Sequence, residues 1–255
     1  MPAENPDWLI NGFLTRGNTA FMIGQPKKAL KSWMFLAAAW DMSEGKPVWG
    51  IFDMPRPMRV IYFTQEDTKE NIHDRIMAHV GAKRELSDRL WIVPKNLNIK
   101  FDIGYSLIEK EVQAVKEKAG DIDLIMFDPL INMIVGNEND SQTISGVWTA
   151  LYNLQATFNC GTMIAHHIRK PPQKKDDYDP TDPFNGRGSS AIYGGGDAFA
   201  TVVPIEKNKE YGEINVYFES KRAATPDPAL FRVNFQTGQV EHKGAPKAAR
   251  ELGDI

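Results

Sequence analysis

Residues 21–40, with the sequence FMIGQPKKALKSWMFLAAAW, decide the fold of this chain. The segment opens with an apolar run, residues 21–23, that has the character of a buried strand. A turn follows over residues 24–30. Lys31 and Ser32 then begin a run rich in Ala, Leu, Met and Trp, which contains no Gly or Pro and has the composition of a helix. The order of strand, loop, Lys-Ser and helix is the layout of a phosphate-binding P-loop.

The chemistry of such a loop assigns a role to each part of the segment. The N–H groups of the loop and of the helix N-terminus face the phosphates, Lys reaches the β and γ oxygens, and the Ser hydroxyl binds Mg²⁺. We therefore predict that Lys31 binds phosphate and that Ser32 binds the metal ion. The predicted nucleotide-binding residues are Gly24, Gln25, Pro26, Lys27, Lys28, Ala29, Leu30, Lys31, Ser32 and Trp33.

The segment departs from the template G-x-x-x-x-G-K-[ST] in two ways. Lys31 follows Gly24 by seven residues rather than six, and Leu30 replaces the glycine before the lysine. A non-Gly residue in the left-handed conformation costs about 1 kcal/mol, and a nest of N–H groups is harder to build without glycine. The alternative is a Lys-Ser pair that merely starts a helix.

Composition narrows the class of protein. The chain has 255 residues, 42% hydrophobic and 25% charged, as in a globular protein of one large domain or slightly more. One cysteine, Cys160, excludes a disulfide framework and a cysteine zinc cluster. A net charge of −3 argues against a surface coated in basic residues, so a nucleic acid would meet a local basic patch. With no signal peptide and no long apolar run, we expect a cytoplasmic protein with no membrane partner.

Carboxylates follow two of the predicted buried strands. The run RVIYFT at 59–64 is followed by Gln65, Glu66 and Asp67, and the run at 123–127 is followed by Asp128. Carboxyl ends of strands in an open α/β sheet are where ligands bind. Asp67 can be explained as a helix cap, whereas Glu66 cannot, so Glu66 is the candidate general base. Asp128 has the Walker B pattern and is the second predicted metal ligand.

The predicted strand at 162–165 is followed by two histidines and two cations: His166, His167, Arg169 and Lys170. We interpret this group as a γ-phosphate sensor that leads into a basic loop. Adjacent residues of a strand point to opposite sides, and no further His or Cys cluster lies nearby in the sequence, so a metal site is not favoured. We expect His167 to face the ligand, and the alternative of packed histidines stays open.

The loop from Pro171 to Arg187 is long and polar. Loops of this length inside a compact domain are usually functional or disordered. Lys174 and Lys175 lie on it together with aromatic residues, a combination that suits single-stranded nucleic acid. Aspartates dilute the signal, so a plain solvated loop is the alternative.

The remaining segments complete the expected domain, residues 1–242, followed by a polar mobile tail, residues 243–255. Residues 5–14 read as a short amphipathic lead-in. Further strands are predicted at 90–94, 202–206, 213–220 and 230–236, and helices around 72–80, 108–115, 147–154 and after 188.

The order of these motifs resembles the RecA-like P-loop ATPases related to the plasmid replicative helicase RepA. The matching segments, in order, are DWLINGF, IGQPKKALKSW, EGKPVWG, VIYFTQED, DLIMFDPL, MIAHHIRK and GRGSSA. They span residues 7–239. Each motif is loose alone, but the set in this order is specific.

The resemblance implies an α/β fold with a RecA-like core: a mostly parallel twisted sheet flanked by helices, with a C-terminal antiparallel extension. It also implies a ring of identical subunits, usually a hexamer, with ATP and Mg²⁺ at the subunit interfaces. By position, Lys31 and Ser32 match the Walker A pair, Glu66 the catalytic glutamate, Asp128 the Walker B aspartate and His167 the sensor.

The resemblance further assigns the cations. Lys221 and Arg222 fall where such ATPases place residues that reach the γ-phosphate of the neighbouring subunit, and Arg187 is a second candidate. The segments after Asp128 and after Lys170 fall on the loops that face DNA, which makes Arg169, Lys170, Lys174 and Lys175 the predicted nucleic-acid contacts.

The leading hypothesis is therefore an ATP-hydrolysing, ring-forming replicative DNA helicase, or an ATPase stimulated by single-stranded DNA, from a plasmid or a virus and located in the cytoplasm of a bacterium or of a virus-infected cell. A second hypothesis is a recombinase-type ATPase similar to RecA and RadA. A third is a DNA-binding scaffold ring with a degenerate P-loop and little hydrolysis.

Overall fold

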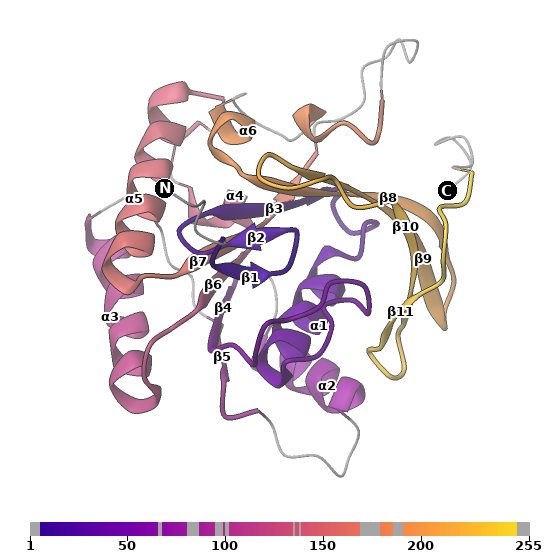
Figure 1. Cartoon of the computed structure of the whole chain (residues 1–255), viewed down its shortest axis with the longest axis horizontal. Coiled ribbons are helices and arrows are strands. Elements are labelled where there is room, and N and C mark those ends of the chain that lie inside the picture. The colour runs from indigo at the N-terminus through magenta and orange to yellow at the C-terminus, as the bar shows by residue number, and fades with distance from the viewer. Residues whose placement is uncertain are drawn as a thin grey trace.

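The computed structural model of the protein describes residues 6–65, 68–80, 87–94, 99, 102–134, 136–137, 139–168, 179–185 and 191–248. A single large sheet forms its centre, with helices on both faces (Figure 1). Helices α1 (Lys31–Glu44) and α2 (Lys69–Val80) cover one face, and α3 (Asp102–Ala119) and α5 (Ser141–Phe158) cover the other. The remaining helices are short: α4 Leu130–Met133, η1 Pro183–Asn185 and α6 Ala191–Gly195.

The nine strands of this sheet lie in the order β11-β10-β9-β8-β3-β7-β6-β4-β5. Their bounds are β3 Thr19–Gly24, β4 Val60–Thr64, β5 Leu90–Pro94, β6 Leu124–Asp128, β7 Gly161–His167, β8 Ala198–Lys207, β9 Tyr211–Ser220, β10 Ala229–Asn234 and β11 Val240–His242. The strands from β8 to β5 run parallel to their neighbours, and β8 to β11 pair antiparallel. The predicted fold class, a mostly parallel sheet with a C-terminal antiparallel extension, is confirmed.

The central strands are parallel because helices bury both of their faces. In β3, Phe21 and Ile23 belong to the core beneath α3 and α5, whereas Met22 belongs to the core beneath α1. Every residue of β3, β4, β6 and β7 is buried. Such continuous apolar runs are the reason that the strands were visible in the sequence.

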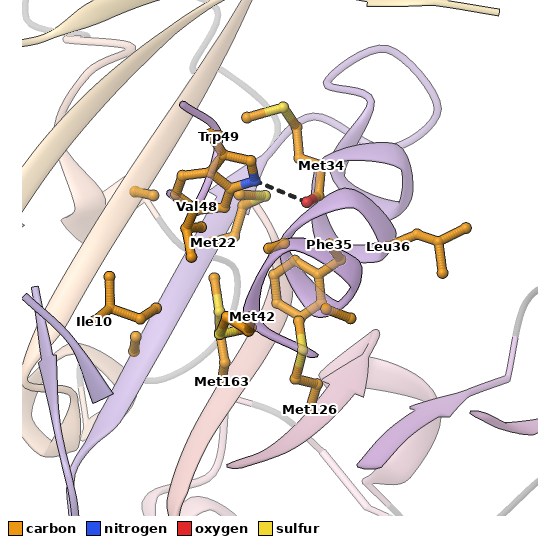
Figure 2. Packing of buried hydrophobic residues seen from close by; sticks show 14 of the residues in the cluster. Ile10, Met22, Met34, Phe35, Leu36, Met42, Val48, Trp49, Met126 and Met163 are labelled. Carbon is orange, nitrogen blue, oxygen red and sulfur yellow. Dashed lines mark hydrogen bonds between the residues drawn. The ribbon is translucent and has the colours of Figure 1, made fainter. Parts of the chain in front are cut away.

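Helix α1 is buried on most of its circumference. Met34 and Phe35 are both fully buried, and the ring of Phe35 lies near Met42 and Met126 (Figure 2). The indole Nε1 of Trp49 donates a 2.8 Å hydrogen bond to the carbonyl oxygen of Met34 (Figure 2). The C-terminal strands curve toward the side of the sheet on which α1 and α2 lie (Figure 1) and contribute apolar residues to the same core. Gly45 ends the helix in the left-handed conformation, which favours glycine.

The N-terminal lead-in is a hairpin of two short strands rather than a simple amphipathic segment. Strands β1 (Trp8–Ile10) and β2 (Leu14–Thr15) pair antiparallel. Arg16, which follows β2, forms ion pairs with Asp7 at 2.7 Å and with the buried Asp123 at 3.0 Å. These contacts fix the hairpin to the edge of the sheet opposite the P-loop, because Asp123 lies directly before β6.

The chain after β11 is also more ordered than expected at its start. The side chain of Asn215 accepts a hydrogen bond from the N–H of Lys247 and donates one to its carbonyl oxygen. Residues 243–248, which we expected to begin a mobile tail, are thus held on β9 instead, while residues 249–255 lie outside the described part of the chain. Among the described residues, none of the helices is both long enough and apolar enough to cross a membrane.

Candidate functional site

The carboxyl ends of four neighbouring parallel strands meet at one edge of the sheet. The register pairs Gly24 of β3 with His167 of β7, and Thr64 of β4 with Asp128 of β6. The N–H of Gln65 donates to the carbonyl oxygen of Asp128 at 3.1 Å, so β4 continues beside β6 to this edge. The structure therefore brings together the predicted P-loop, Walker B aspartate and sensor histidine, which are far apart in the sequence.

Side-chain alternation places Asp128 and His167 on the same face of the sheet as α1. Met126 and Ala165 belong to the core beneath α1, and Asp128 and His167 each lie two residues further along the same strands. His166 lies on the opposite face, fully buried, with its ring centre 6.5 Å from that of Phe21. His167 is thus the histidine on the P-loop side of the sheet.

Close packing explains the glycine that opens the loop. A Cβ atom at Gly24 would lie 2.7 Å from Cβ of Ala29 and 3.0 Å from the carbonyl oxygen of Val202. The loop turns tightly over the end of β3, and because of this close approach only a residue without a side chain fits at position 24.

The two departures from the template have visible consequences in the loop. Leu30, at the place of the missing glycine, adopts the left-handed conformation with φ of 53°, and Lys27 does so with φ of 62°. The N–H of Lys28 donates to the oxygen of Pro26 at 2.7 Å, and that of Ala29 to the oxygen of Gln25 at 3.3 Å. Since proline has no N–H, three loop residues offer no amide to a phosphate, and the helix N-terminus becomes the main source of donors.

Lys31 is the first residue of α1, and its ammonium points back to the start of the loop. Nζ donates to the carbonyl oxygens of Gly24 and Gln25, both at 3.0 Å, and the residue is only 6% exposed. A buried charge requires such partners. Its position beside the N-terminus of α1 concentrates positive potential at the loop, and Ser32 follows it half-buried on the same turn.

Asp128 is held by a neighbouring strand. The hydroxyl of Tyr62 donates a 2.7 Å hydrogen bond to Oδ2 of Asp128, and both residues are 3% exposed. The sequence pattern identified Asp128 but gave no sign of Tyr62, which reads as one more aromatic residue of a buried strand.

A pocket of about 440 Å³ is lined by Trp33, on the first turn of α1, and by residues of α2 and of the chain after β10. Arg75 of α2 lies with Cζ 4.8 Å from the ring centre of Trp33, and the ring centre of Phe235 lies 5.7 Å from it. The other lining residues are Asn71, Asp74, Ala78 and Gln236. A pocket with aromatic faces and a guanidinium suits a planar base. Sequence reasoning included Trp33 but missed Arg75 and Phe235, which reach Trp33 only through the tertiary fold.

Lys221 and Arg222 lie at the opposite edge of the sheet from the P-loop of the same chain. Nζ of Lys221 donates to the oxygens of Tyr193 at 2.9 Å and Gly194 at 3.3 Å, and Arg222 forms an ion pair of 3.1 Å with Asp197. The N–H of Asp197 bonds to Thr19 at the start of β3, whereas the loop begins at the end of that strand. These cations therefore do not contribute to the nucleotide site of their own chain.

Several predicted residues cannot be placed. Glu66, Arg187, Arg169, Lys170, Lys174 and Lys175 lie outside the described residues.

The chain is similar to known proteins in its sequence profile and in its fold. Residues 2–173 match the sequence profile of the AAA domain family. The chain belongs to this family. A search of curated protein sequences found no match. Among solved structures, a DnaB-like replicative helicase, described with its interactions with primase, is similar with a TM-score of 0.66 and 14% identity over 94% of this chain.

A second similar structure extends the comparison. A KaiC-like protein from the hyperthermophilic archaeon Pyrococcus horikoshii has a TM-score of 0.60 and 16% identity, with 95% of each chain covered. This AAA-domain chain spans 63% of the DnaB-like helicase. At these identities the likeness concerns the fold, which is that of the RecA-like P-loop ATPases.

A nucleotide with magnesium fits the residues present. The positive N-terminus of α1 and the ammonium of Lys31 suit phosphate oxygens, and a side chain at Gly24 would clash with Ala29 and Val202. The Ser32 hydroxyl and the Asp128 carboxylate are hard oxygen donors, which Mg²⁺ prefers.

Proposed function

We propose that this AAA-domain protein hydrolyses ATP and, as a ring of identical subunits, moves along single-stranded DNA as a replicative helicase of the RepA type. The convergence of the P-loop, Asp128 and His167 on one edge and one face of the sheet is the observation that carries the ATPase part of the proposal. The helicase part rests on the motif order and on the likeness in fold to a DnaB-like replicative helicase.

The residues of the edge have distinct roles in this proposal. Lys31 binds the phosphates, Ser32 and Asp128 hold Mg²⁺, and Glu66 accepts the proton of the attacking water. Mg²⁺, when bound, neutralises charge on the phosphate oxygens. His167 contacts the γ-phosphate side of the site and reports hydrolysis to the chain that follows β7.

The positions of Lys221 and Arg222 favour assembly of the chain into a ring. Lys221 and Arg222 are remote from the P-loop of their own chain, so they can act on a nucleotide only through a neighbouring copy. A cation supplied in this way stabilises the charge of the transition state and contributes roughly 10³–10⁵ in rate in other NTPases. Arg187 is the second candidate for this role, and a hexamer is the expected assembly.

DNA would be contacted by the basic segment after β7. Arg169, Lys170, Lys174 and Lys175 would bind the phosphates of a single strand that passes through the ring, in the cytoplasm of a bacterium or of a virus-infected cell. Phosphate contacts of this kind carry no sequence information.

The test is ATP hydrolysis measured with and without single-stranded DNA. We expect turnover that rises with DNA and is lost in Lys31→Ala, whereas Lys209→Ala, a change on an exposed turn, keeps the parent rate. Binding of an ATP analogue is measured in parallel. Turnover equal in the parent and in Lys31→Ala would contradict the assignment of the P-loop.

One observation favours a second candidate, a ring that binds DNA and hydrolyses little ATP. The amides of Lys28 and Ala29 are bonded within the loop, so fewer donors face a phosphate than in a glycine-rich loop. DNA binding without measurable hydrolysis would support this candidate.

A further inference from the structure

The loop that replaces a glycine with Leu30 is matched by a glycine on another strand. Leu30 is 7% exposed although it is the last residue of the loop, directly before α1. A Cβ atom at Gly212, near the start of β9, would lie 2.5 Å from Cδ1 of Leu30 and 3.2 Å from Cζ of Phe235. Gly212 therefore leaves a notch in β9, and the side chain of Leu30 fills it.

A second contact joins the same two regions. The ring centres of Trp33, on the first turn of α1, and Phe235, directly after β10, lie 5.7 Å apart. The N–H of Phe235 donates to the oxygen of Glu210 at 2.8 Å, which fixes Phe235 to the turn before β9. The C-terminal strands, which curve toward α1 in Figure 1, thus touch both ends of the segment from Leu30 to Trp33.

These contacts compensate for the unusual loop. The left-handed conformation of Leu30 is unfavourable for a residue with a Cβ atom. Burial of the leucine side chain against Gly212 favours it, because apolar surface leaves water. In a glycine-rich loop the backbone adopts this conformation without help, whereas here the conformation depends on a distant strand.

We propose that Gly212 is a positioning residue for the nucleotide site. By accepting the side chain of Leu30, it holds the backbone at Leu30 and Lys31 in the conformation that directs the helix N-terminus at the phosphates. The inference rests on the proposed function, in which this loop binds ATP.

The test separates nucleotide affinity from stability. In Gly212→Val, the new side chain fills the notch and displaces Leu30, so the affinity for a non-hydrolysable ATP analogue should fall at least about 10-fold. Overpacking at a buried position also lowers stability, so the midpoint of urea unfolding is measured for the same variants, and affinities are compared only under conditions where each variant is folded. Gly194→Val is the control, since a Cβ atom at Gly194 meets nothing within 4 Å. Gly212→Ala serves as a milder variant if the valine protein fails to fold.

A double-mutant cycle tests the contact itself. If Leu30 and Gly212 act through the notch, the losses in Leu30→Ala and Gly212→Val should not add, because the alanine leaves room for the valine. Additive losses, or an affinity of Gly212→Val equal to that of the parent, would overturn the proposal.

Hydrogen exchange keeps the two proposals distinguishable. If the parent protein binds no ATP analogue, the proposed function fails, but the notch can still be tested. Gly212→Val should then speed amide exchange in residues 25–34, while Gly194→Val should not. Unchanged exchange in that segment would overturn the role of Gly212 whatever the ligand.

Discussion

Tyr62 and Asp128 lie on neighbouring parallel strands, and the tyrosine hydroxyl donates a 2.7 Å hydrogen bond to the aspartate carboxylate. The ring of Tyr62 also packs 6.3 Å from that of Phe35 on α1. The aromatic side chain is fixed by the core, and its hydroxyl in turn fixes one oxygen of the proposed metal ligand. Such outer contacts orient the ligands of metal sites.

Tyr62→Phe removes this hydrogen bond and keeps the ring. We expect the fold to survive, with a loss of about 1 kcal/mol in the free energy of unfolding. The Mg²⁺ concentration that gives half-maximal ATP hydrolysis should rise about 10-fold, as when other residues that hydrogen-bond to metal ligands are replaced. A magnesium titration of the ATPase rate measures this.

Tyr152→Phe is the matched control, since Tyr152 is 51% exposed on α5. If Tyr62→Phe and this control show the same magnesium dependence as the parent, the hydrogen bond has no part in holding the metal ligand.

Glu66→Gln keeps the shape of the side chain and removes the proposed base. ATP should bind as in the parent, whereas turnover should fall by roughly 10²–10⁴. Single-turnover hydrolysis and analogue binding, measured on the same preparation, give the two quantities. An unchanged rate would transfer the role to Asp67.

The sequence was informative where apolar residues form continuous runs. Strands β4, β5 and β6 are apolar runs that stop at polar residues, and β5 has the predicted bounds Leu90–Pro94. Because ligand-binding residues of parallel sheets follow the strand ends, Asp128 and the loop after Gly24 could be found without a structure.

Strand β7 is buried on both faces, so the sequence does not show which face each of its side chains occupies. His166 and His167 follow apolar residues that are buried on both sides of β7, so no alternation of polar and apolar residues distinguishes them. Only the register with β3 and the packing of Phe21 place His167 on the side of the P-loop.

Contacts between distant segments account for what the sequence did not reveal. The cost of Leu30 in the left-handed conformation was predictable, but its counterpart Gly212 lies on a strand far along the chain. Arg75 and Phe235 likewise reach Trp33 only when α2 and the end of β10 fold against α1.

Asp41 makes stability depend on pH. Burial raises the pKa of this carboxyl from 3.8 to about 7, although the N–H of Trp49 donates to it at 3.1 Å. The folded state then takes up a proton that the unfolded state lacks, so the stability contribution of Asp41 is lost as the pH rises from about 4 to about 7. At about 1.4 kcal/mol per pH unit, the loss is at most about 4 kcal/mol.

Asp41→Asn should therefore be more stable than the parent at pH 8, and the advantage should shrink at pH 5 and below. The asparagine oxygen can still accept the N–H of Trp49. Urea unfolding at the two pH values measures the difference, with Asp53→Asn, at an exposed position, as the control. Equal stability of parent and Asp41→Asn at pH 8 would mean that the carboxyl is ordinarily solvated.

The contribution of Asp123 to stability depends on pH in the opposite direction. Burial alone would raise the pKa of its carboxyl, but hydrogen bonds from Arg56, the N–H of Arg59 and Arg16 outweigh burial and lower the pKa. Its contribution to stability is present above the unfolded pKa near 3.8 and is lost as the pH falls through the lower folded value. Asp123→Asn should cost about 1–3 kcal/mol at pH 7, and this difference should narrow only below the unfolded pKa of 3.8. Urea unfolding at pH 7 and at a pH below 3.8 measures the narrowing.

The proposed DNA contacts give a salt dependence that can be predicted in sign and size. Each phosphate neutralised on a single strand contributes about 0.7 to the slope of log affinity against log salt, because condensed counterions are released. Replacing Lys174 and Lys175 with alanine should thus lower the slope by up to about 1.4 and weaken binding to all sequences alike.

The matched control replaces Lys110 and Lys118, which are exposed on α3. Fluorescence anisotropy with a labelled single strand and an ATP analogue, titrated at several salt concentrations, measures both pairs. Equal slopes for the two double variants would remove the loop from the DNA path, and no binding by the parent at low salt would exclude the helicase and scaffold proposals together.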